Sequence, residues 1–270
     1  MVLKKTKDHF NKVPNNLKKK YLNISVVTVC LNSEKTIHKC LESVIQQNYP
    51  KDNIEHIIID GGSTDNTLKI IKNNGKLVKF IQSRKDKGIY DAMNNGIKKC
   101  SGDIIVILNS DDFFFKNAFK TASKYFIKYK IDYLFGSVIK NRVYHNFFPE
   151  KIWYSFNFYP SHSISFFIKK KILTKIGRYN IKFKYSADRD FLFRLIKNQK
   201  FNGMPTKKKE VFGKFSLYGA SSRVSFLEKN IEEIRIRISN NESIFKVLLF
   251  FLIYLNYYFI KKIIHFFKHI

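Results

Sequence analysis

The amino-acid sequence predicts an α/β fold with a mostly parallel central sheet flanked by helices. Four short runs of β-branched and apolar residues have the composition of strands buried on both faces. Each run is followed by a stretch in which apolar residues recur at every third or fourth position, the spacing of a helix with one buried face. At 270 residues and 44% hydrophobic content, the chain can bury one substantial core. We therefore expect one enlarged, doubly wound domain.

The predicted elements follow one another closely from residue 24 onward. Ser33 is a plausible N-cap for the first helix, and the sequence GGSTDNT leads into the second helix, which would bury Leu68 and Ile71. Ser63 and Thr64 are able to cap that second helix, which would leave Asp60 free for another role. The predicted strands are 24–31, 55–60, 77–81 and 104–108. The first predicted helix follows Ser33 and has its apolar positions between Ile37 and Ile45, the second follows GGSTDNT, and the third is 89–99.

Beyond residue 115 the pattern loosens into aromatic-rich stretches. A strand is still indicated at 166–168, a short helix at 171–176 that ends at Gly177, and a helix at 190–196. We interpret this region as an annex built onto the same sheet.

The two ends of the chain differ from the centre. The first 22 residues contain seven Lys and one Asp, which indicates a flexible basic arm, and no apolar run there is long enough for a signal peptide. The segment 244–270 carries four Lys, two His and no acid. Its apolar centre, 247–260, would rise only ~21 Å as a helix, short of the ~30 Å hydrocarbon core. We expect an amphipathic or apolar helix embedded in a membrane interface; a helix packed on its own domain or on a partner chain is the alternative.

Composition restricts the partners and the compartment. Lys and Arg number 50 against 21 Asp and Glu, a net charge of +29, which indicates either an anionic partner or coding bias. Arg is scarce beside Lys, and this weakens specific nucleic-acid readout. The three cysteines are far apart with no CxxC pair, which excludes a disulfide scaffold and a zinc ribbon and favours a reducing cytosol.

Polar and acidic residues gather where the predicted strands end, which is where open parallel sheets bind ligands. Asn32 follows the first strand, Asp60 ends the second, Asp86 follows the third, and Asp111 and Asp112 follow the fourth. Adjacent carboxylates repel each other unless a cation compensates, and Mg²⁺ or Mn²⁺ would bridge them to a phosphate. A nucleotide diphosphate is thus the expected ligand. The GxxxxGK[ST] and GxGxxG loops are both absent from the sequence.

Five motifs, ISVVTVCLNSEKTI, SVIQQNYP, IIIDGGSTDNT, DKGIYDAMNNGI and ILNSDD, occur in an order and spacing that resembles the family 2 glycosyltransferases of the GT-A fold, a Rossmann-like α/β architecture. The resemblance covers about residues 24–194 and is to bacterial enzymes that build lipopolysaccharide O-antigen, capsule or other surface polysaccharides. It implies a nucleotide-sugar-binding half at 23–115 and an acceptor-binding half at 116–225. The segment 226–270 lies beyond the resemblance, and we expect it to be helical and membrane-associating from its composition.

The resemblance also implies roles on the donor side. Asp60 would hold the nucleobase, with the strand end near Thr28 and Cys30 lining the same pocket. Asp111 would face the ribose and the metal, and Asp112 would be a direct ligand of Mg²⁺ or Mn²⁺. Three further positions complete this side: Asp86 and Asp91 approach the donor, and Asn109 replaces the first Asp of the common DxDD form.

On the acceptor side, SADRD resembles the ED-x-D motif, with Ala187 in place of the Glu. Asp188 then matches the catalytic base that takes the proton of the acceptor hydroxyl. Asp190 is the second candidate for the base, and helix capping is the structural alternative for Asp188. His162 resembles a His that lines the acceptor cleft, with a purely structural role as its alternative.

Together these features predict an inverting glycosyltransferase that transfers a sugar from a nucleotide-sugar donor to a lipid-linked glycan. A UDP-sugar is the expected donor. We expect a cytoplasmic enzyme, peripheral on the inner face of the cytoplasmic membrane and attracted to its anionic surface, with no specific nucleic-acid partner and with homo-oligomers possible. A nucleotidyltransferase-like enzyme and a non-enzymatic polyanion-binding or scaffold protein remain the alternatives.

Overall fold

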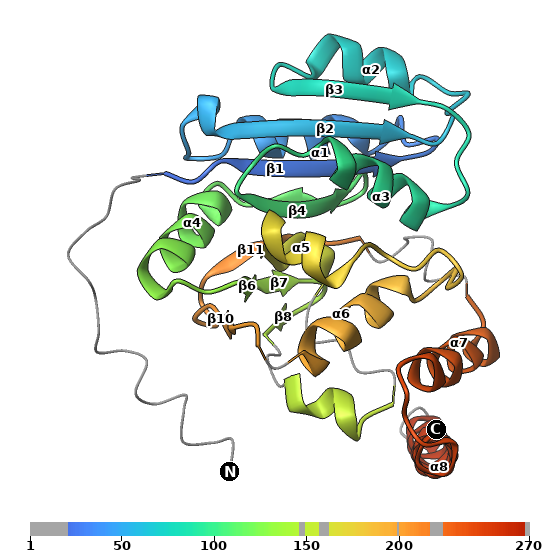
Figure 1. The fold of residues 1–270 in the computed structure, drawn as a ribbon. Helices are drawn as coiled ribbons and strands as arrows, with labels where there is room; N and C mark the ends of the chain where they lie inside the picture. The colour runs from blue at the N-terminus through green and yellow to red at the C-terminus, as the bar shows by residue number, and fades with distance from the viewer. Residues whose placement is uncertain (1–20, 146–148, 157–161, 199, 217–223, 268–270) are drawn as a thin grey trace.

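The computed structural model describes residues 21–145, 149–156, 162–198, 200–216 and 224–267, and its centre is a seven-stranded sheet with the order β10-β6-β9-β4-β1-β2-β3. β1, β2, β3 and β4 pair in parallel, as do β6 and β10, whereas β9 is antiparallel to both β4 and β6. The sheet is therefore mostly parallel, as predicted (Figure 1). Its strands are β1 (Ile24–Cys30), β2 (Ile54–Asp60), β3 (Val78–Ser83), β4 (Ile104–Asn109), β6 (Tyr133–Phe135), β9 (Phe166–Lys169) and β10 (Gly203–Pro205).

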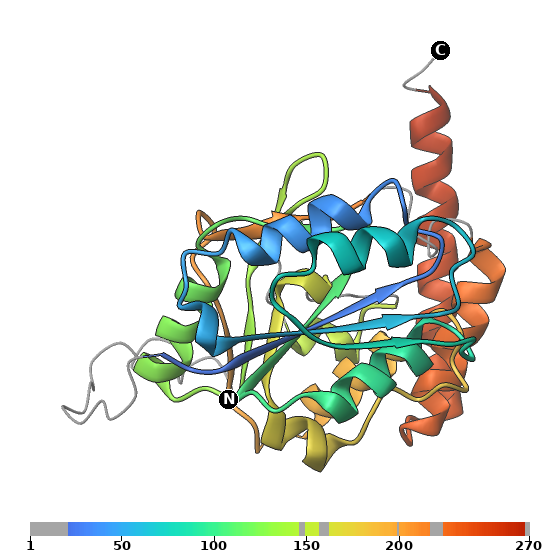
Figure 2. The same ribbon diagram turned by 90° about the horizontal axis from the view of Figure 1, so that it is seen from above.

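Helices cover both faces of this sheet. In β1, Ile24 and Val26 face one core and Val27 and Val29 face the other, because successive side chains of a strand point to opposite sides. The first core is closed by α1 (Ile37–Ile45), α2 (Thr67–Asn74) and α4 (Ala118–Tyr129). The second is closed by α3 (Ile89–Lys99), α5 (Lys170–Ile176) and α6 (Ala187–Lys197). The result is a three-layer domain with helices on either side of the sheet (Figure 2).

A second, four-stranded sheet was not predicted. Its order is β5-β11-β7-β8, and β7, β8 and β11 lie near β6 and β10, at one end of the main sheet (Figure 1). None of its strands is longer than four residues, too short for an alternating pattern to be visible in the sequence. The strands are β5 (Phe113–Phe114), β7 (Ser137–Ile139), β8 (Val143–Tyr144) and β11 (Val211–Lys214).

The predicted starts of α1 and α6 are wrong. The prediction that the annex joins the main sheet is confirmed by β6, β9 and β10. α1 begins at Ile37 with Thr36 as its N-cap; the hydroxyl of Ser33 instead pairs with that of Ser110 at 2.8 Å. α6 begins at Ala187 rather than at residue 190, so Asp188 lies in its first turn and is not its cap. Short 3-10 turns occupy Pro149–Trp153 and Ser163–Ser165.

The C-terminal region forms two helices, α7 (Phe226–Ser239) and α8 (Ile244–Phe267). A capping box between Ser225 and Glu228 starts α7. α8 packs through one face, where Phe226 stacks on Tyr258 with ring centroids 4.1 Å apart and Phe251 contacts Phe156. Figure 2 shows α8 along one side of the molecule, with its C-terminal end beyond the α1 and α2 layer. Within the described part of the chain, no helix is both long and apolar enough to cross a bilayer.

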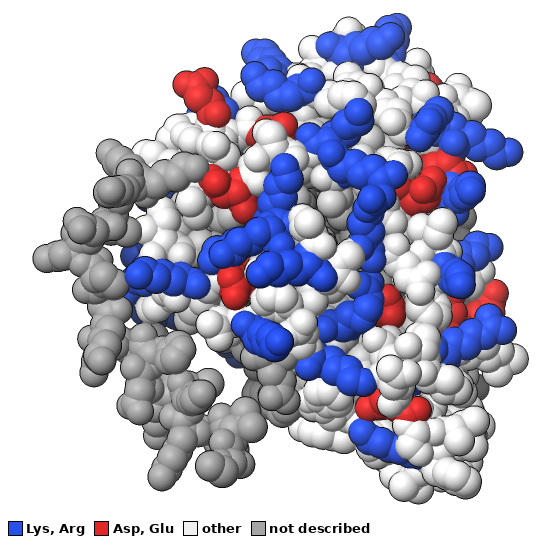
Figure 3. Space-filling view, in the orientation of Figure 1, with Lys and Arg blue, Asp and Glu red and all other residues white. Residues whose placement is uncertain are grey.

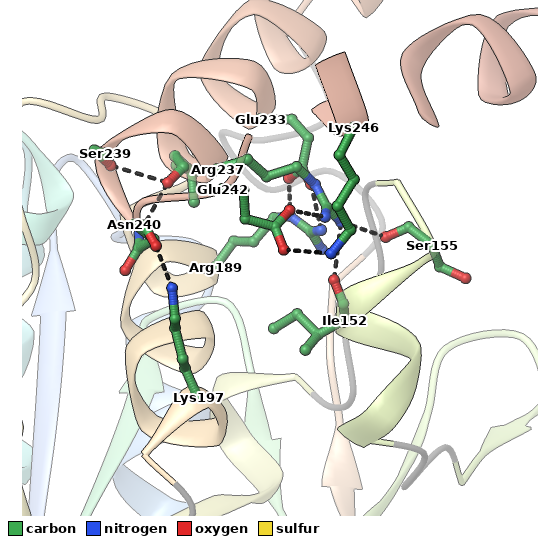
Figure 4. Close-up of polar contacts among 11 residues, drawn as sticks. Ile152, Ser155, Arg189, Lys197, Glu233, Arg237, Ser239, Asn240, Glu242 and Lys246 are labelled. Atoms are coloured by element: carbon green, nitrogen blue, oxygen red, sulfur yellow. Dashed lines mark hydrogen bonds and ion pairs between the residues drawn. The ribbon is translucent and has the colours of Figure 1, made fainter. Parts of the chain in front are cut away.

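A buried ionic network joins α6, α7 and α8 (Figure 4). Glu233 accepts hydrogen bonds from Arg189 of α6 and from Arg237 of α7, and all three side chains are almost fully buried. Arg237 also donates to Glu242 at 2.8 Å, and Glu242 accepts from Lys246 of α8 at 3.1 Å. The predicted helical extension is therefore attached to the domain through charged as well as apolar contacts.

The two ends of the chain are only partly within the described residues, whereas all three cysteines are described. Residues 1–20 of the predicted basic arm lie outside the described residues. The last two residues of that arm, Tyr21 and Leu22, pack on Tyr49, whose hydroxyl donates to the carbonyl oxygen of Leu22 at 2.6 Å. The three cysteines are buried and unpaired.

Candidate active site

The turn after β2 is organised around the carboxylate of Asp60, which is fully buried. Its Oδ2 accepts from the backbone N–H of Ser63 at 3.0 Å and from the Ser83 hydroxyl at 2.7 Å, and its Oδ1 accepts from the Ser63 hydroxyl at 2.5 Å. Burial opposes ionisation, but these hydrogen bonds outweigh it and lower the pKa of Asp60. The carboxylate is thus ionised. The prediction that Ser63 and Thr64 cap α2 is wrong, since Asn66 is its N-cap.

Cys30 and Asn32 lie against this turn, whereas Thr28 does not. The thiol of Cys30 is 3.6 Å from Oδ1 of Asp60; burial and this carboxylate raise its pKa, so it is a neutral thiol. Asn32, in the left-handed region with a φ of 48°, accepts the backbone N–H of Thr64 at 2.9 Å. The hydroxyl of Thr28 is instead paired with His56 in the core at 2.8 Å.

Asp86 and Asp91 lie on the loop and helix that follow β3. Oδ1 of Asp86 accepts the backbone N–H of Gly88 at 2.8 Å, and a Cβ added to Gly61 would meet Oδ2 of Asp86 at 2.8 Å. Because Gly61 has no side chain, the Asp86 carboxylate can lie directly against the Asp60 turn. Asp91, in the first turn of α3, accepts the backbone N–H of Lys87 at 3.2 Å. Cys30, Asp60 and Asp86 therefore share one edge of the sheet.

The end of β4 holds a second group of polar side chains. Asp112 is 2% exposed, and burial together with the neighbouring Asp111 raises its pKa to about 8. Its Oδ1 accepts the backbone N–H of Ser216 at 2.9 Å, and its Oδ2 lies 3.3 Å from Nδ2 of Asn109. Asp111 is half-buried beside it. The hydrogen bond between Ser33 and Ser110 joins this group to the loop after β1.

His162 faces the same group from the turn before β9. Its Nδ1 is 3.8 Å from Oδ2 of Asp112, and its ring stacks on Phe215 with centroids 4.2 Å apart. Burial, with a smaller contribution from Lys140, lowers the pKa of His162 to about 4. The imidazole is therefore neutral at physiological pH. It is placed beside the predicted metal ligands by a polar contact on one side and an aromatic contact on the other.

The residues at the end of β4 fit a hard divalent cation in their chemistry, although within the described residues no group of three or more His, Cys, Asp or Glu is arranged as a metal site. Oδ1 of Asn109 is buried and has no hydrogen-bond partner in the described part of the protein. An unpaired buried amide oxygen and a buried carboxylate next to a second carboxylate are both costly without a positive charge. Carboxylate and amide oxygens are ligands that Mg²⁺ and Mn²⁺ accept.

Asp188 lies at the start of α6, in the helical layer that α3, α5 and α6 form on one face of the main sheet. Its Oδ1 accepts the Tyr90 hydroxyl of α3 at 2.8 Å and the backbone N–H of Arg189 at 2.9 Å. Burial raises the pKa of Asp188, and these hydrogen bonds oppose the rise. The side chain is only half-buried, so it can meet a substrate.

Asp190, the second candidate for the base, is 2% exposed. Its Oδ2 is paired with Arg194 at 2.9 Å and its Oδ1 accepts from Asn240 at 3.0 Å. Both oxygens are therefore engaged in contacts that hold α6 in place, and this distinguishes the two carboxylates in favour of Asp188.

Sequence reasoning missed the polar and aromatic residues that hold the predicted ones in place. These are Ser63 and Ser83 on Asp60, Ser216 on Asp112, Phe215 on His162, and Tyr90 on Asp188. Tyr90 falls inside the DKGIYDAMNNGI motif, so a signal for it was present, but its partner is 98 residues away in the chain.

Comparison with known proteins decides the family. The sequence profile of Glycosyl transferase family 2 matches residues 25–194, which contain the strand-end residues and Asp188 described above. The chain belongs to this family.

Relatives of this glycosyltransferase include proteins of archaea and mycobacteria. It is 40% identical over 107 residues to the dolichyl N-acetyl-alpha-D-glucosaminyl phosphate 3-beta-D-2,3-diacetamido-2,3-dideoxy-beta-D-glucuronosyltransferase of Methanococcus voltae. That match spans 36% of this chain and only a third (33%) of the relative. A PGL/p-HBAD biosynthesis glycosyltransferase of Mycobacterium bovis is 28% identical over 184 residues, which are 64% of this chain and 70% of the relative.

Solved structures share the GT-A fold. TarS 1-349 of S. aureus, in complex with UDP-GlcNAc, superposes with a TM-score of 0.65 at 20% identity, over 83% of this chain and 69% of that one. The mannosyltransferase PcManGT from Pyrobaculum calidifontis, in complex with GDP-Man and Mn2+, gives a TM-score of 0.63 at 16% identity, over 83% of this chain and 66% of that one. These likenesses establish the GT-A architecture of this glycosyltransferase.

Proposed function

We propose that this family 2 glycosyltransferase transfers a sugar, with inversion, from a nucleotide-sugar donor to a hydroxyl of a lipid-linked glycan. The observation that carries the proposal is the hydrogen bond between Tyr90 and Asp188. It joins the helix of the candidate base to the helix whose preceding loop lies against the Asp60 turn. A donor bound at the strand ends and an acceptor bound at Asp188 would thus lie close to each other.

Inversion requires in-line displacement, with the acceptor oxygen entering as the bond to the diphosphate breaks. Asp188 accepts the hydroxyl proton, the oxygen forms the new glycosidic bond, and the nucleoside diphosphate departs with the bonding electron pair. Asp60, Cys30 and Asp86 hold the nucleoside part at the β1 and β2 ends. Asp111, Asp112 and the amide oxygen of Asn109 would hold Mg²⁺ or Mn²⁺, which supplies positive charge to the departing diphosphate.

The donor and acceptor classes follow from the site and from its relatives. Asp60 suits the N3–H of a uracil ring, and the TarS structure of the same fold contains UDP-GlcNAc. The relative from Methanococcus voltae is named for transfer to a dolichyl-linked sugar phosphate. UDP-sugars and polyprenyl-linked glycans are therefore the donors and acceptors to examine first.

The test is transfer from radiolabelled UDP-sugars to a polyprenyl-diphosphate-linked sugar with Mn²⁺ present, comparing wild type with Asp188→Asn and Asp190→Asn. We expect Asp188→Asn to lower kcat by at least ~100-fold with little change in donor binding, because proton transfer contributes that much. Asp190→Asn should act mainly on stability. Equal activity in wild type and Asp188→Asn would refute the assignment, and donor that is neither transferred nor hydrolysed by wild type would favour a scaffold role.

We further propose that α8 associates with an anionic membrane, so that the enzyme works as a peripheral protein on the cytoplasmic face of the membrane. A helix that is apolar on its outer side needs a cover other than water, and residues 244–270 carry four Lys and no acid, which suits anionic lipid. The large apolar side chains that α8 exposes are Ile244, Phe245, Leu248, Leu249, Leu252, Ile253, Tyr257, Phe259, Ile260, Ile263 and Ile264.

The basic surface elsewhere does not favour nucleic acid. Lys and Arg side chains are spread over the face that α3, α5 and α6 form (Figure 3). Lys98 of α3 and Lys171 and Lys175 of α5 are exposed. Single-strand binding surfaces interleave such charges with exposed aromatic rings. In the described part of the protein, the large exposed aromatic side chains are Tyr154 and those of α8.

Flotation with vesicles of phosphatidylglycerol and phosphatidylcholine tests the membrane proposal on the full chain. Wild type should float, and Leu249→Asp/Ile253→Asp should not, since both positions are exposed and the change leaves the packed face of α8 intact. Lys98→Gln/Lys171→Gln is the matched control, because it lowers the net charge by the same amount at exposed positions of α3 and α5. Wild type that stays in the soluble fraction as a dimer, and becomes monomeric in the Asp variant, would instead assign α8 to a second copy of the chain.

A further inference from the structure

Tyr90 occupies the second position of α3, with its ring in the core and its hydroxyl at the candidate active site. The residue is 9% exposed, and its ring packs on Tyr179 with centroids 5.6 Å apart. The hydroxyl lies 2.8 Å from Oδ1 of Asp188 and 3.1 Å from the carbonyl oxygen of Tyr185. A phenol has one proton to donate, so these two acceptors compete for it, and a carboxylate is the stronger acceptor of the two.

We propose that Tyr90 is the positioning residue of the base: its hydroxyl holds Oδ1 of Asp188, so that Oδ2 is the oxygen that takes the acceptor proton. The inference rests on the proposed role of Asp188 and adds a residue to it. The hydrogen bonds from the Tyr90 hydroxyl and from the backbone N–H of Arg189 both end on Oδ1 of Asp188. Two donors that converge on one oxygen restrain rotation of the carboxylate about its Cβ–Cγ bond more strongly than one donor does.

The position of α3 makes Tyr90 suitable for this task. A Cβ added to Gly96 would lie 2.3 Å from Cγ1 of Val27, so the helix approaches β1 as closely as only glycine permits. Asn94 exchanges hydrogen bonds with the backbone of Tyr179, accepting at 3.0 Å and donating at 2.8 Å. α3 is therefore held both against the sheet and against the segment that leads into α6. Because Tyr90 is part of α3, its hydroxyl is held in place as well.

The carbonyl oxygen of Tyr185 gives the hydroxyl a second acceptor once Asp188 has taken a proton. A protonated carboxyl is a weaker acceptor than a carboxylate, and a buried hydroxyl without any partner is costly. When the proton arrives on Oδ2, the Tyr90 O–H can turn to Tyr185 without a movement of the ring. The bond to Oδ1 thus favours the ionised base before transfer and is released at little cost afterwards.

Loss of the hydrogen bond from Tyr90 to Asp188 should shift the pH dependence of kcat/KM toward higher pH. The groups around Asp188 are Tyr90 of α3, Tyr179 before α6, and Arg189, whose guanidinium is paired with Glu233 of α7. A hydrogen bond to the carboxylate lowers its pKa, so Tyr90→Phe raises the pKa of Asp188. A base acts in its ionised form, and the acid limb of kcat/KM should therefore move to higher pH, by about one unit.

The control is Tyr125→Phe. Tyr125 of α4 also donates a hydrogen bond to a carboxylate, that of Glu210, at 2.6 Å, and it is 7% exposed. The two variants thus lose the same kind of bond with the same change of side chain, and a general loss of stability affects both. Only Tyr90→Phe is expected to move the acid limb, and it should also lower kcat/KM above the shifted limb, because the ionised carboxylate is no longer held in orientation by the Tyr90 hydroxyl.

Two measurements decide the matter. The first is the pH profile of kcat/KM for wild type, Tyr90→Phe and Tyr125→Phe. The second is a carbon-13 NMR titration of the Asp188 carboxyl in the resting protein, assigned with Asp188→Asn, which needs no turnover. An acid limb and an Asp188 titration that both stay in place in Tyr90→Phe would overturn the inference. Wild type without transfer would refute the proposed function instead, and the titration would still report on Tyr90.

Discussion

The carboxylate of Glu233 in α7 forms a bidentate ion pair with the guanidinium of Arg189 in α6, and neither side chain is exposed to solvent. Arg189 is the residue after Asp188, so this pair attaches the C-terminal helices directly behind the candidate base. Arg237 adds a second guanidinium to the same carboxylate and also donates to the carbonyl oxygens of Ile152 and Ser155. The start of α6 is therefore supported by two segments distant in sequence, α7 and the segment that contains Ile152 and Ser155.

Replacement of Glu233 by Ala should destabilise the protein by roughly 3–5 kcal/mol, because it leaves two buried guanidinium groups without their shared counter-ion. Urea unfolding followed by circular dichroism measures the change. Glu42→Ala, on the exposed side of α1, is the matched control and should cost less than about 0.5 kcal/mol. A loss below ~1 kcal/mol in Glu233→Ala would show that the network is not needed for the fold.

The buried His56 should make stability depend on pH. Burial lowers its pKa from 6.5 to about 3. Between these two pH values the unfolded chain binds a proton at His56 and the folded protein does not. The contribution of neutral His56 is fully present above pH 6.5 and is lost on acidification toward pH 3, at ~1.4 kcal/mol per pH unit for one proton. The pKa of His162 is also lowered. The contribution of His56 is therefore obtained from the difference in stability between wild type and a His56 variant at each pH.

His56→Gln should therefore flatten the acid side of the stability curve between pH 6.5 and 4 by close to one proton, as measured by urea unfolding at several pH values. His38→Gln, on the exposed face of α1, should leave the curve unchanged. The same slope in His56→Gln and wild type would contradict a neutral, buried His56.

Gly61 should be required for nucleotide binding rather than for folding. An Ala side chain there would meet the flexible end of Asp86 at 2.8 Å, and the carboxylate would have to move away from the Asp60 turn. We expect Gly61→Ala to raise the Kd of UDP roughly tenfold, about 1.4 kcal/mol, with little change in stability. Calorimetry on Gly61→Ala, Asp86→Ala and the double variant tests the coupling. If the two effects add fully, Gly61 does not act through Asp86.

Sequence periodicity predicted the elements whose signal is local. β1 and α3 have the expected bounds to within a residue, because a run of β-branched residues and a helical spacing of apolar ones are visible in short windows. The gathering of Asp60, Asp86 and Asp112 at one edge followed from the rule that parallel strands end on the same side.

What the sequence did not show depends on contacts between distant segments. Ser33 did not cap α1 because its hydroxyl has a partner in Ser110, 77 residues away. The second sheet consists of strands too short for a pattern, and β11 joins it from far along the chain. The hydrogen bond from Tyr90 to Asp188 has the same origin, since no spacing rule relates α3 to α6.

The most direct test of the account is calorimetric binding of UDP, with and without Mn²⁺, to wild type, Asp112→Asn and Asp103→Asn. Asp103 precedes β4 and Asp112 follows it, so the two substitutions make the same change of side chain at opposite ends of one strand. We predict metal-dependent binding in wild type and in Asp103→Asn, and its loss in Asp112→Asn. Absence of binding of UDP, GDP and dTDP to wild type with Mn²⁺ present would contradict a nucleotide-sugar site at the strand ends.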